Sequence, residues 1–300
     1  MNVLVTGAFR CAQQQLDAIA QLGHQVVFMQ QESESLPVDP AWVEGVVCNG
    51  LFLHHDISQF VNLRFIQLTS AGFDRVPMEE VNRRGIRICN ARGVYGIPMA
   101  EFAVAGVLQL YKQSRFFAEN QKNHGWNKHR GLLELCGKQV TIVGCGNIGQ
   151  ECAKRFAAFD CRVVGVDIFE AELPNIQKMY HISRLGEVLP DSDVVVLTLP
   201  LTEETKHLFG EAAFAAMKKG AILVNIARGG VVDTQALIHA LQDHLGGAVL
   251  DVFEEEPLSA DSPLWEMDQV LLTPHNSFVG DHNSQRLEAV ILKNLKECSK

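Results

Sequence analysis

Residues 139–149 run Gln139-Val140-Thr141-Ile142-Val143-Gly144-Cys145-Gly146-Asn147-Ile148-Gly149. The β-branched run predicts a strand, and the glycines that follow it allow a tight turn into a helix. Such a turn lets a pyrophosphate approach the backbone, where the helix N-terminus offers unpaired N–H donors to the anion. We therefore predict a dinucleotide site at Gly144, Gly146, Asn147, Ile148 and Gly149, with a glycine-rich turn that binds no ligand as the alternative.

Asp167 ends the next predicted strand. It follows Gly149 at close to the spacing of about 20 residues at which a carboxylate accepts hydrogen bonds from the adenosine ribose. The next residues, Ile168, Phe169 and Glu170, include no lysine or arginine to receive a 2′-phosphate, and Glu170 would repel one. We therefore expect NAD rather than NADP as the cofactor.

Short β-branched runs alternate with helical patterns twice along the chain, which is typical of parallel sheets covered by helices. We therefore predict an α/β fold with two doubly wound parallel-sheet domains. The first series has strands over 2–6, 25–29, 45–48, 64–68 and 86–89, with helices over 12–21, 55–60 and 77–84. The second has strands over 139–143, 162–167, 193–198, 221–225, 247–251 and 270–273, with helices over 148–158, 211–218 and 233–243.

An apolar, helix-periodic stretch from Met99 to Tyr111 lies between the two series, and a polar segment follows it through Arg130. Pro98 fits the first turn of this helix, where its missing N–H costs little. A helical pattern over 286–298 is expected to pack back on the first series. We predict one domain from residues 1–97 and 280–300 and a second from 98–279, in line with about 150 residues per domain.

The composition excludes several classes of protein. The 300 residues carry 26 basic and 35 acidic side chains, and this net charge of −9 argues against a nucleic-acid partner. Hydrophobic residues at 47% and charged residues at 20% are typical of a globular protein. The eight cysteines include no C-x-x-C pair, so we expect no metal site and a reducing compartment. No signal peptide or membrane span is evident, and we expect a cytoplasmic protein that binds small molecules.

Three polar segments follow later strands of the second series, where open α/β sheets place their ligands. They are residues 225–230, 251–257 and 273–276, and they supply a guanidinium, carboxylates and an imidazole. An arginine offers a planar fork for a substrate carboxylate, and a histidine held by a glutamate can donate a proton. Taken singly, each has an ordinary reading as a helix cap, a solvated charge or a loop residue. Their joint appearance beside the glycine turn favours a catalytic site.

These segments, together with the glycine turn and Leu199-Pro200-Leu201-Thr202, resemble the D-isomer-specific 2-hydroxyacid dehydrogenase family. The match runs over nearly the whole chain in the expected order. The resemblance implies a flavodoxin-like substrate domain, a Rossmann-type NAD-binding domain, an active site in the cleft, and a homodimer built around the nucleotide domain. It also implies hydride transfer between NAD(H) and a 2-keto acid or D-2-hydroxy acid.

The resemblance also implies roles for individual residues. Arg228 is expected to bind the substrate carboxylate and carbonyl, and His275 to act as the acid/base with Glu256 as its partner. Glu256 is preferred to its neighbours because it directly precedes Pro257. The cofactor residues implied are Leu199, Pro200, Ile226, Ala227 and Asp251, and the implied substrate residues are Ser70, Ala71, Gly72 and Tyr95. A plain turn at 70–72 and a packed tyrosine remain the alternatives.

The loop over residues 48–53 usually shapes the substrate pocket in this family. Here it contains no lysine or arginine to hold a second anion. We therefore expect a small unphosphorylated 2-keto acid such as glyoxylate, hydroxypyruvate, pyruvate or a branched analogue. The alternatives are a phosphoglycerate dehydrogenase-like enzyme and, from another class, a non-catalytic NAD-sensing scaffold like the C-terminal-binding corepressors.

Overall fold

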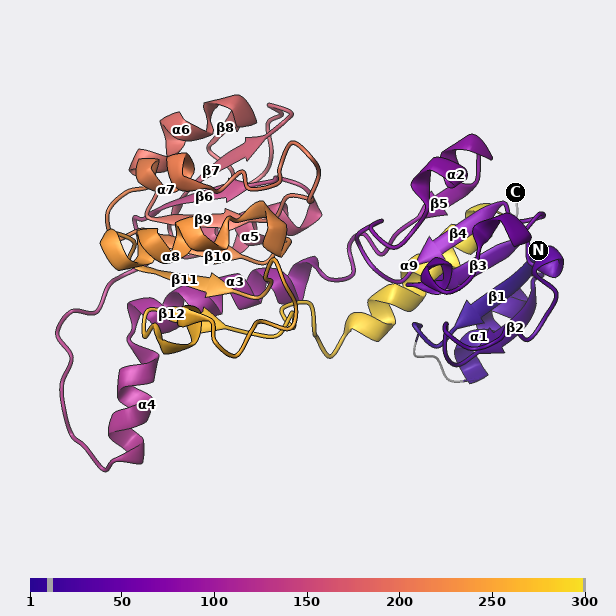
Figure 1. Cartoon of the computed structure of the whole chain (residues 1–300), viewed down its shortest axis with the longest axis horizontal. Helices are drawn as coiled ribbons and strands as arrows, with labels where there is room; N and C mark the ends of the chain where they lie inside the picture. Colours follow the sequence, from indigo (N-terminus) through magenta and orange to yellow (C-terminus); the bar gives the residue numbers. More distant parts are fainter. Residues whose placement is uncertain (10–12, 299–300) are drawn as a thin grey trace. The chain divides into compact units, whose positions relative to one another are not determined.

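The computed structural model describes residues 1–9 and 13–298, so Cys11 and also Ala12, the first residue of the predicted first helix, lie outside it. The chain divides into two compact units, Met1–Tyr95 with Gly280–Lys300, and Gly96–Val279. Each unit is built on one parallel β-sheet with helices packed on it (Figure 1). The predicted α/β class with two parallel sheets is confirmed.

The first unit has a five-stranded sheet in the order β2-β1-β3-β4-β5, the strand order of flavodoxin-like folds. Its elements are β1 (Asn2–Thr6), α1 (Gln13–Gln21), β2 (Gln25–Met29), β3 (Gly45–Cys48), β4 (Phe65–Leu68), α2 (Met78–Arg83), β5 (Arg87–Cys89) and α9 (Asn283–Cys298). Helix α9 packs on α1 and β4. Its buried Leu287, Ile291 and Leu295 join Val3 and Val5 of β1 in one apolar cluster. The end of the chain therefore completes the core of the first unit.

The expected helix over residues 55–60 is wrong. Asp56 accepts a hydrogen bond from the Ser58 N–H (2.9 Å), but it caps only a 3₁₀ helix at Ile57–Gln59. Ile57 and Phe60 are both buried and lie three residues apart, which suits the three residues per turn of a 3₁₀ helix. Phe60 then leaves the helical region, with φ −85° and ψ 64°.

The second unit has a seven-stranded sheet in the order β12-β11-β10-β9-β6-β7-β8, and every pair of neighbours is parallel. The strand order reverses between β6 and β9, the position at which Rossmann folds bind dinucleotides. Its strands are β6 (Gln139–Val143), β7 (Arg162–Asp167), β8 (Lys178–His181), β9 (Val194–Leu197), β10 (Ile222–Asn225), β11 (Gly247–Leu250) and β12 (Val270–Leu272). Its helices are α3 (Gly96–Tyr111), α4 (Ser114–Lys122), α5 (Asn147–Ala158), α6 (Leu185–Val188), α7 (Glu211–Ala216) and α8 (Thr234–Asp243).

Helices cover both faces of this second sheet. α3 packs along α5 and against β10 and β11, while α6, α7 and α8 pack together. A side-chain carbon at Gly106 of α3 would lie 2.6 Å from Val249 of β11, so a glycine is needed for this close approach. Beyond α3, α4 and the loop that follows it extend away from the sheet (Figure 1). Among the described residues, no helix combines the length and the apolar character needed to cross a bilayer.

Among the strands and α-helices, the structure adds three that the sequence did not predict: β8, α4 and the one-turn helix α6. β8 lies at the edge of the sheet and pairs only with β7. Its residues, Lys178 to His181, form no β-branched run, which is why the pattern missed it. α4 lies within the segment that was expected only to be polar, and none of its side chains is buried.

Candidate active site

Two of the three glycines of the β6–α5 turn, Gly144 and Gly149, meet a steric requirement. Gly144 has a φ of 94°, in the left-handed region, and a side-chain carbon there would lie 2.6 Å from the Leu199 backbone nitrogen. A side-chain carbon at Gly149 would lie 2.2 Å from the Gly144 carbonyl oxygen. Gly146 caps the N-terminus of α5 and borders open space. The turn therefore leaves room for a pyrophosphate beside the first N–H groups of α5.

Asp167 ends β7 beside this turn. Its carboxylate accepts hydrogen bonds from the N–H groups of Cys145 (2.6 Å) and Ile168 (2.7 Å). These bonds fix the carboxylate against the glycine turn, and each oxygen keeps a second lone pair for a ribose hydroxyl. Asp167 and the turn therefore lie side by side, and the residues present fit the dinucleotide that the sequence predicts there.

The ends of β9 and β10 place the next predicted cofactor residues at the same edge of the sheet. Leu199 is buried against Gly144, and Pro200 follows it at the surface. Ile226 and Ala227 follow β10 and are also buried. These residues present backbone rather than polar side chains to this edge.

A turn held by Asn225 positions Arg228. Asn225 accepts a hydrogen bond from the Ala227 N–H (3.1 Å) and donates one to the Arg228 carbonyl (3.2 Å). The Arg228 guanidinium donates to the Ala227 carbonyl (2.8 Å), and its side chain is half-buried. Asn225, at the end of β10, is a supporting residue that the sequence analysis did not single out.

Asp251 organises the loop that carries His275. Asp251 is fully buried, and its carboxylate accepts hydrogen bonds from the Thr273 hydroxyl (2.6 Å) and from the N–H groups of Asn276 (2.7 Å) and Ser277 (3.0 Å). The His275 N–H donates to the Asp251 carbonyl (2.8 Å). His275 has a φ of 51°, a conformation that costs about 1 kcal/mol outside glycine. Asp251 therefore stabilises this turn rather than offering a free carboxylate.

Glu256 and His275 form a hydrogen-bonded pair. The Glu256 Oε2 lies 2.9 Å from the His275 Nδ1, and Oε1 accepts the Phe253 N–H at 3.1 Å. Because Nδ1 faces the carboxylate, the proton sits there and Nε2 is left for a reacting group. The choice of Glu256 among three consecutive glutamates thus matches the geometry.

The predicted substrate loop of the first unit follows β4. The Asn90 side-chain amide donates to the Ala71 carbonyl (2.6 Å), and the Ser70 hydroxyl donates to the Gly72 carbonyl (3.1 Å). The Tyr95 hydroxyl donates to the Thr69 carbonyl, directly before this loop. Burial raises the pKa of Tyr95, so its hydroxyl stays a donor. Tyr95 therefore stabilises the start of this loop through a hydrogen bond to its backbone.

A second histidine–carboxylate pair was not predicted. His207 Nε2 lies 2.6 Å from Oε1 of Glu254, two residues before Glu256. The two residues are 47 positions apart, and no spacing rule joins them. The run of three glutamates was the one signal in the sequence that pointed to this place.

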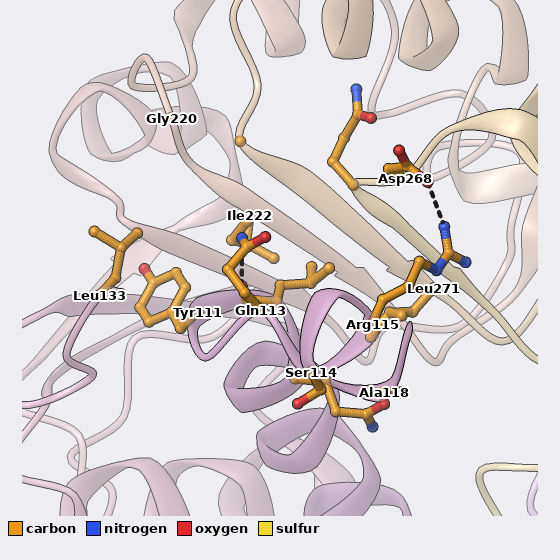
Figure 2. A pocket seen from close by; sticks show the side chains of 14 residues that line it. Tyr111, Gln113, Ser114, Arg115, Ala118, Leu133, Gly220, Ile222, Asp268 and Leu271 are labelled. Carbon is orange, nitrogen blue, oxygen red and sulfur yellow. Dashed lines mark hydrogen bonds and ion pairs between the residues drawn. The ribbon is translucent and has the colours of Figure 1, made fainter. Parts of the chain in front are cut away.

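A pocket of about 540 Å³ lies at the amino ends of strands of the second sheet, opposite the carboxyl ends where the predicted site residues lie. Figure 2 shows Tyr111, Gln113 and Arg115 from the α3–α4 region around it, with Ile222 at the start of β10 and Leu271 of β12. Because these strands begin here, the pocket is separate from the carboxyl-end site. Among the described residues, no group of three metal-ligating side chains is present.

Comparisons with known proteins agree with this geometry. Residues 104–277 match the profile of the D-isomer specific 2-hydroxyacid dehydrogenase NAD binding domain. Glyoxylate reductase from Thermofilum pendens is 37% identical over 247 residues, which are 78% of this chain and 71% of that protein. The chain belongs to this family.

Two solved structures of the family extend the likeness to nearly the whole chain. A family protein from Aeromonas salmonicida has a TM-score of 0.86 at 31% identity, covering 98% of this chain and 94% of that chain. D-lactate dehydrogenase from Aquifex aeolicus, solved with NAD and lactic acid, has a TM-score of 0.80 at 27% identity, covering 99% and 95%. As a family member, the chain is an NAD-dependent oxidoreductase that interconverts 2-keto and 2-hydroxy acids.

Proposed function

We propose that the protein reduces a small, unphosphorylated 2-keto acid to the D-2-hydroxy acid with NADH. The observation that carries this proposal is the Glu256–His275 pair, held at 2.9 Å at the edge of the sheet where Arg228 and the glycine turn also lie. We assign the second unit to NAD binding, and the first unit, with the loop at 70–72, to substrate binding.

The proposed mechanism divides the work among three side chains. Arg228 binds the substrate carboxylate through its planar fork and polarises the keto oxygen. The nicotinamide, when bound, supplies the hydride. In this step His275 starts as the imidazolium, donates its Nε2 proton to the oxygen that becomes the hydroxyl, and ends as the neutral ring whose remaining proton, on Nδ1, faces Glu256. For the reverse oxidation, His275 accepts that proton.

The charge of the substrate is inferred from the loop after β3. Glu32 accepts hydrogen bonds there from the Thr6 hydroxyl (2.8 Å) and from the N–H groups of Asn49 (2.7 Å) and Gly50 (2.6 Å). Arg75 also reaches this loop, with its Cδ 3.8 Å from the side-chain position at Gly50. The fixed carboxylate of Glu32 offsets this guanidinium, so a substrate phosphate gains little there.

This inference predicts that hydroxypyruvate is reduced with at least tenfold higher kcat/KM than 3-phosphohydroxypyruvate, an energy difference of about 1.4 kcal/mol. Steady-state rates of NADH oxidation with the two acids measure the ratio. Glu32→Gln removes the carboxylate charge and should lower the ratio of kcat/KM for hydroxypyruvate to that for 3-phosphohydroxypyruvate. Preference for the phosphorylated acid would contradict the assignment and favour a phosphoglycerate dehydrogenase-like enzyme.

We propose NAD rather than NADP because a 2′-phosphate would meet the Asp167 carboxylate. In Asp167→Asn, the amide oxygen keeps an acceptor for the Cys145 N–H and the charge is lost. The ratio of kcat/KM for NADPH to that for NADH should therefore rise by about tenfold. Glu170→Gln, which removes a nearby exposed charge, is the control and should change the ratio less. An unchanged ratio in Asp167→Asn would argue against this role.

We also propose a homodimer formed by the second unit. We call α4 and its following loop, residues 114–135, the arm. The arm exposes Trp126 (96% exposed) together with Phe117 and Leu133. Leu133 and Arg115 of the arm line the pocket in Figure 2. Exposed apolar side chains on the arm, beside an open pocket, suit a second copy of the chain, whose own arm would cover them.

Light scattering should give a mass twice the 33.2 kDa of one chain. Trp126→Ser should weaken the dimer by about 10²-fold in Kd, because a buried tryptophan at an interface contributes about 2–4 kcal/mol. Phe169→Ser removes another exposed aromatic side chain, outside the arm, and should leave the mass unchanged. A monomer at micromolar concentration in the unmodified protein would contradict the proposal.

We further propose a cytoplasmic location. The seven cysteines that the structure describes are all free thiols, which suits a reducing compartment. They are Cys48, Cys89, Cys136, Cys145, Cys152, Cys161 and Cys298. Cell fractionation that recovered the protein outside the cytoplasm would contradict this placement.

A further inference from the structure

Three side chains at the carboxyl ends of the strands of the second unit form a hydrogen-bonded cluster, which we call the clamp. They are His207, Thr234 and Glu254. His207 Nε2 lies 2.6 Å from Glu254 Oε1. The Thr234 N–H donates to Glu254 Oε2 at 2.8 Å, and the Thr234 hydroxyl donates to the same oxygen. Both carboxylate oxygens of Glu254 are therefore engaged, each by a different loop.

The clamp joins the loops that follow three neighbouring strands. His207 lies in the loop after β9, Thr234 begins α8 after β10, and Glu254 follows β11. Backbone hydrogen bonds support the same arrangement: the His207 N–H donates to the Gly230 carbonyl (2.9 Å), and the Phe209 N–H donates to the Val231 carbonyl (3.0 Å). One carboxylate therefore holds the β11 loop to the segments that follow β9 and β10.

The β11 loop also carries the partner of the proposed acid/base. Phe253 precedes Glu254, and its N–H donates to Glu256 Oε1 at 3.1 Å. A side-chain carbon at Gly229, next to Arg228, would lie 1.9 Å from the Phe253 carbonyl oxygen. Phe253 of the β11 loop is thus in backbone contact with the Arg228 segment, and its N–H also holds the side chain of Glu256 within the same loop.

The hydrogen bonds of Glu254 favour the ionised form of its carboxyl group. Partial burial opposes the ionisation of Glu254, but the hydrogen bonds from Thr234 and His207 outweigh it and lower the pKa of this carboxyl. Glu254 therefore stays ionised at neutral pH, and hydrogen bonds to an ionised acceptor are the stronger kind. Its neighbour Glu255 is exposed and lies outside the clamp.

We propose that His207 and Glu254 are positioning residues for the reaction, because they hold the β11 loop so that Glu256 meets His275. The inference rests on the proposed roles of Glu256 and His275. Neither His207 nor Glu254 needs to touch the substrate. Small displacements matter here, since misplacing a reacting group by about 1 Å can cost up to 10²-fold in rate.

The test is a double-mutant cycle on the full chain with Glu254→Gln, Glu256→Gln and the double variant. Glu254→Gln keeps the shape of the side chain and should lower kcat by about tenfold, with NADH affinity unchanged. If Glu254 acts through Glu256, adding Glu254→Gln to Glu256→Gln should lower kcat no further. Glu255→Gln removes the same charge one position along and should keep the kcat of the unmodified protein.

A second pair of variants separates positioning from folding. His207→Ala should lower kcat about as much as Glu254→Gln, whereas His207→Gln keeps a donor for the carboxylate and should recover most of the loss. NADH affinity by fluorescence titration and the melting temperature are measured for each variant. Equal losses in NADH affinity and kcat, or full additivity in the cycle, would overturn the inference.

The cycle also separates this inference from the proposed function. An unchanged kcat in Glu254→Gln, together with a large loss in Glu256→Gln, would overturn the clamp alone. An unchanged kcat in Glu256→Gln would remove the proposed role of Glu256, and the clamp inference would fall with it.

Discussion

The His275→Ala variant is expected to lose about 10²- to 10⁴-fold in kcat for 2-keto acid reduction. The reason is geometric. Glu256 engages Nδ1 of His275 at 2.9 Å and so aims Nε2 at the reacting oxygen; in the ring protonated on both nitrogens Nε2 is the proton donor, and alanine removes it altogether. Water then has to supply the proton without being held in place. The affinity for NADH should not change, because the glycine turn and Asp167 are separate from the His275 loop.

Stopped-flow or steady-state oxidation of NADH measures the rate, and fluorescence titration measures cofactor affinity. His239→Ala, on the exposed side of α8, is a suitable control because alanine also favours helix formation. A turnover rate for His275→Ala within a few-fold of the unmodified protein would rule out His275 as the acid.

The Arg228→Ala variant is expected to lose about 10²- to 10⁴-fold in kcat/KM. A guanidinium binds a carboxylate through two charge-assisted hydrogen bonds of about 1.5–3 kcal/mol each, and alanine removes both. Arg228→Lys restores the charge but not the planar fork, so it should recover only part of the loss. The turn itself should survive, because Asn225 holds it through backbone groups at Ala227 and Arg228.

The measurement is the dependence of NADH oxidation on keto acid concentration, with thermal melting as a check on folding. Arg162→Ala removes an exposed guanidinium from the start of β7, at the far end of the strands, and serves as the control. A kcat/KM for Arg228→Ala within tenfold of the unmodified protein would show that the carboxylate binds elsewhere.

The parts of the fold that the sequence predicted are those with strong local patterns. The run from Gln139 to Gly149 predicted a strand, a turn and a helix, and two of its glycines, Gly144 and Gly149, stand where a side chain would clash. The β-branched residues of β9 and β10 predicted strands, and in the structure every residue of both strands is buried. β8 was missed because an edge strand needs no continuous apolar run, and its Lys178 lies over the ring of Tyr180.

The candidate site was predictable only where each residue follows its own strand. Arg228, Glu256 and His275 each lie just past a β-branched run, so the parallel topology gathers them at one edge of the sheet. The His207–Glu254 contact is different, because it joins two loops through side chains 47 positions apart that no spacing rule connects. The hydrogen bonds of the buried Asp251 could not be predicted from the sequence either, because they depend on the conformation of the His275 loop.

The most direct test of this account is to incubate the purified protein with NADH and a panel of unphosphorylated 2-keto acids, and to identify the product by chiral chromatography. The account predicts one D-2-hydroxy acid formed for each NADH oxidised, with the reaction lost in Arg228→Ala. Tight NADH binding without turnover on any member of the panel, or an L-hydroxy acid as the product, would contradict it.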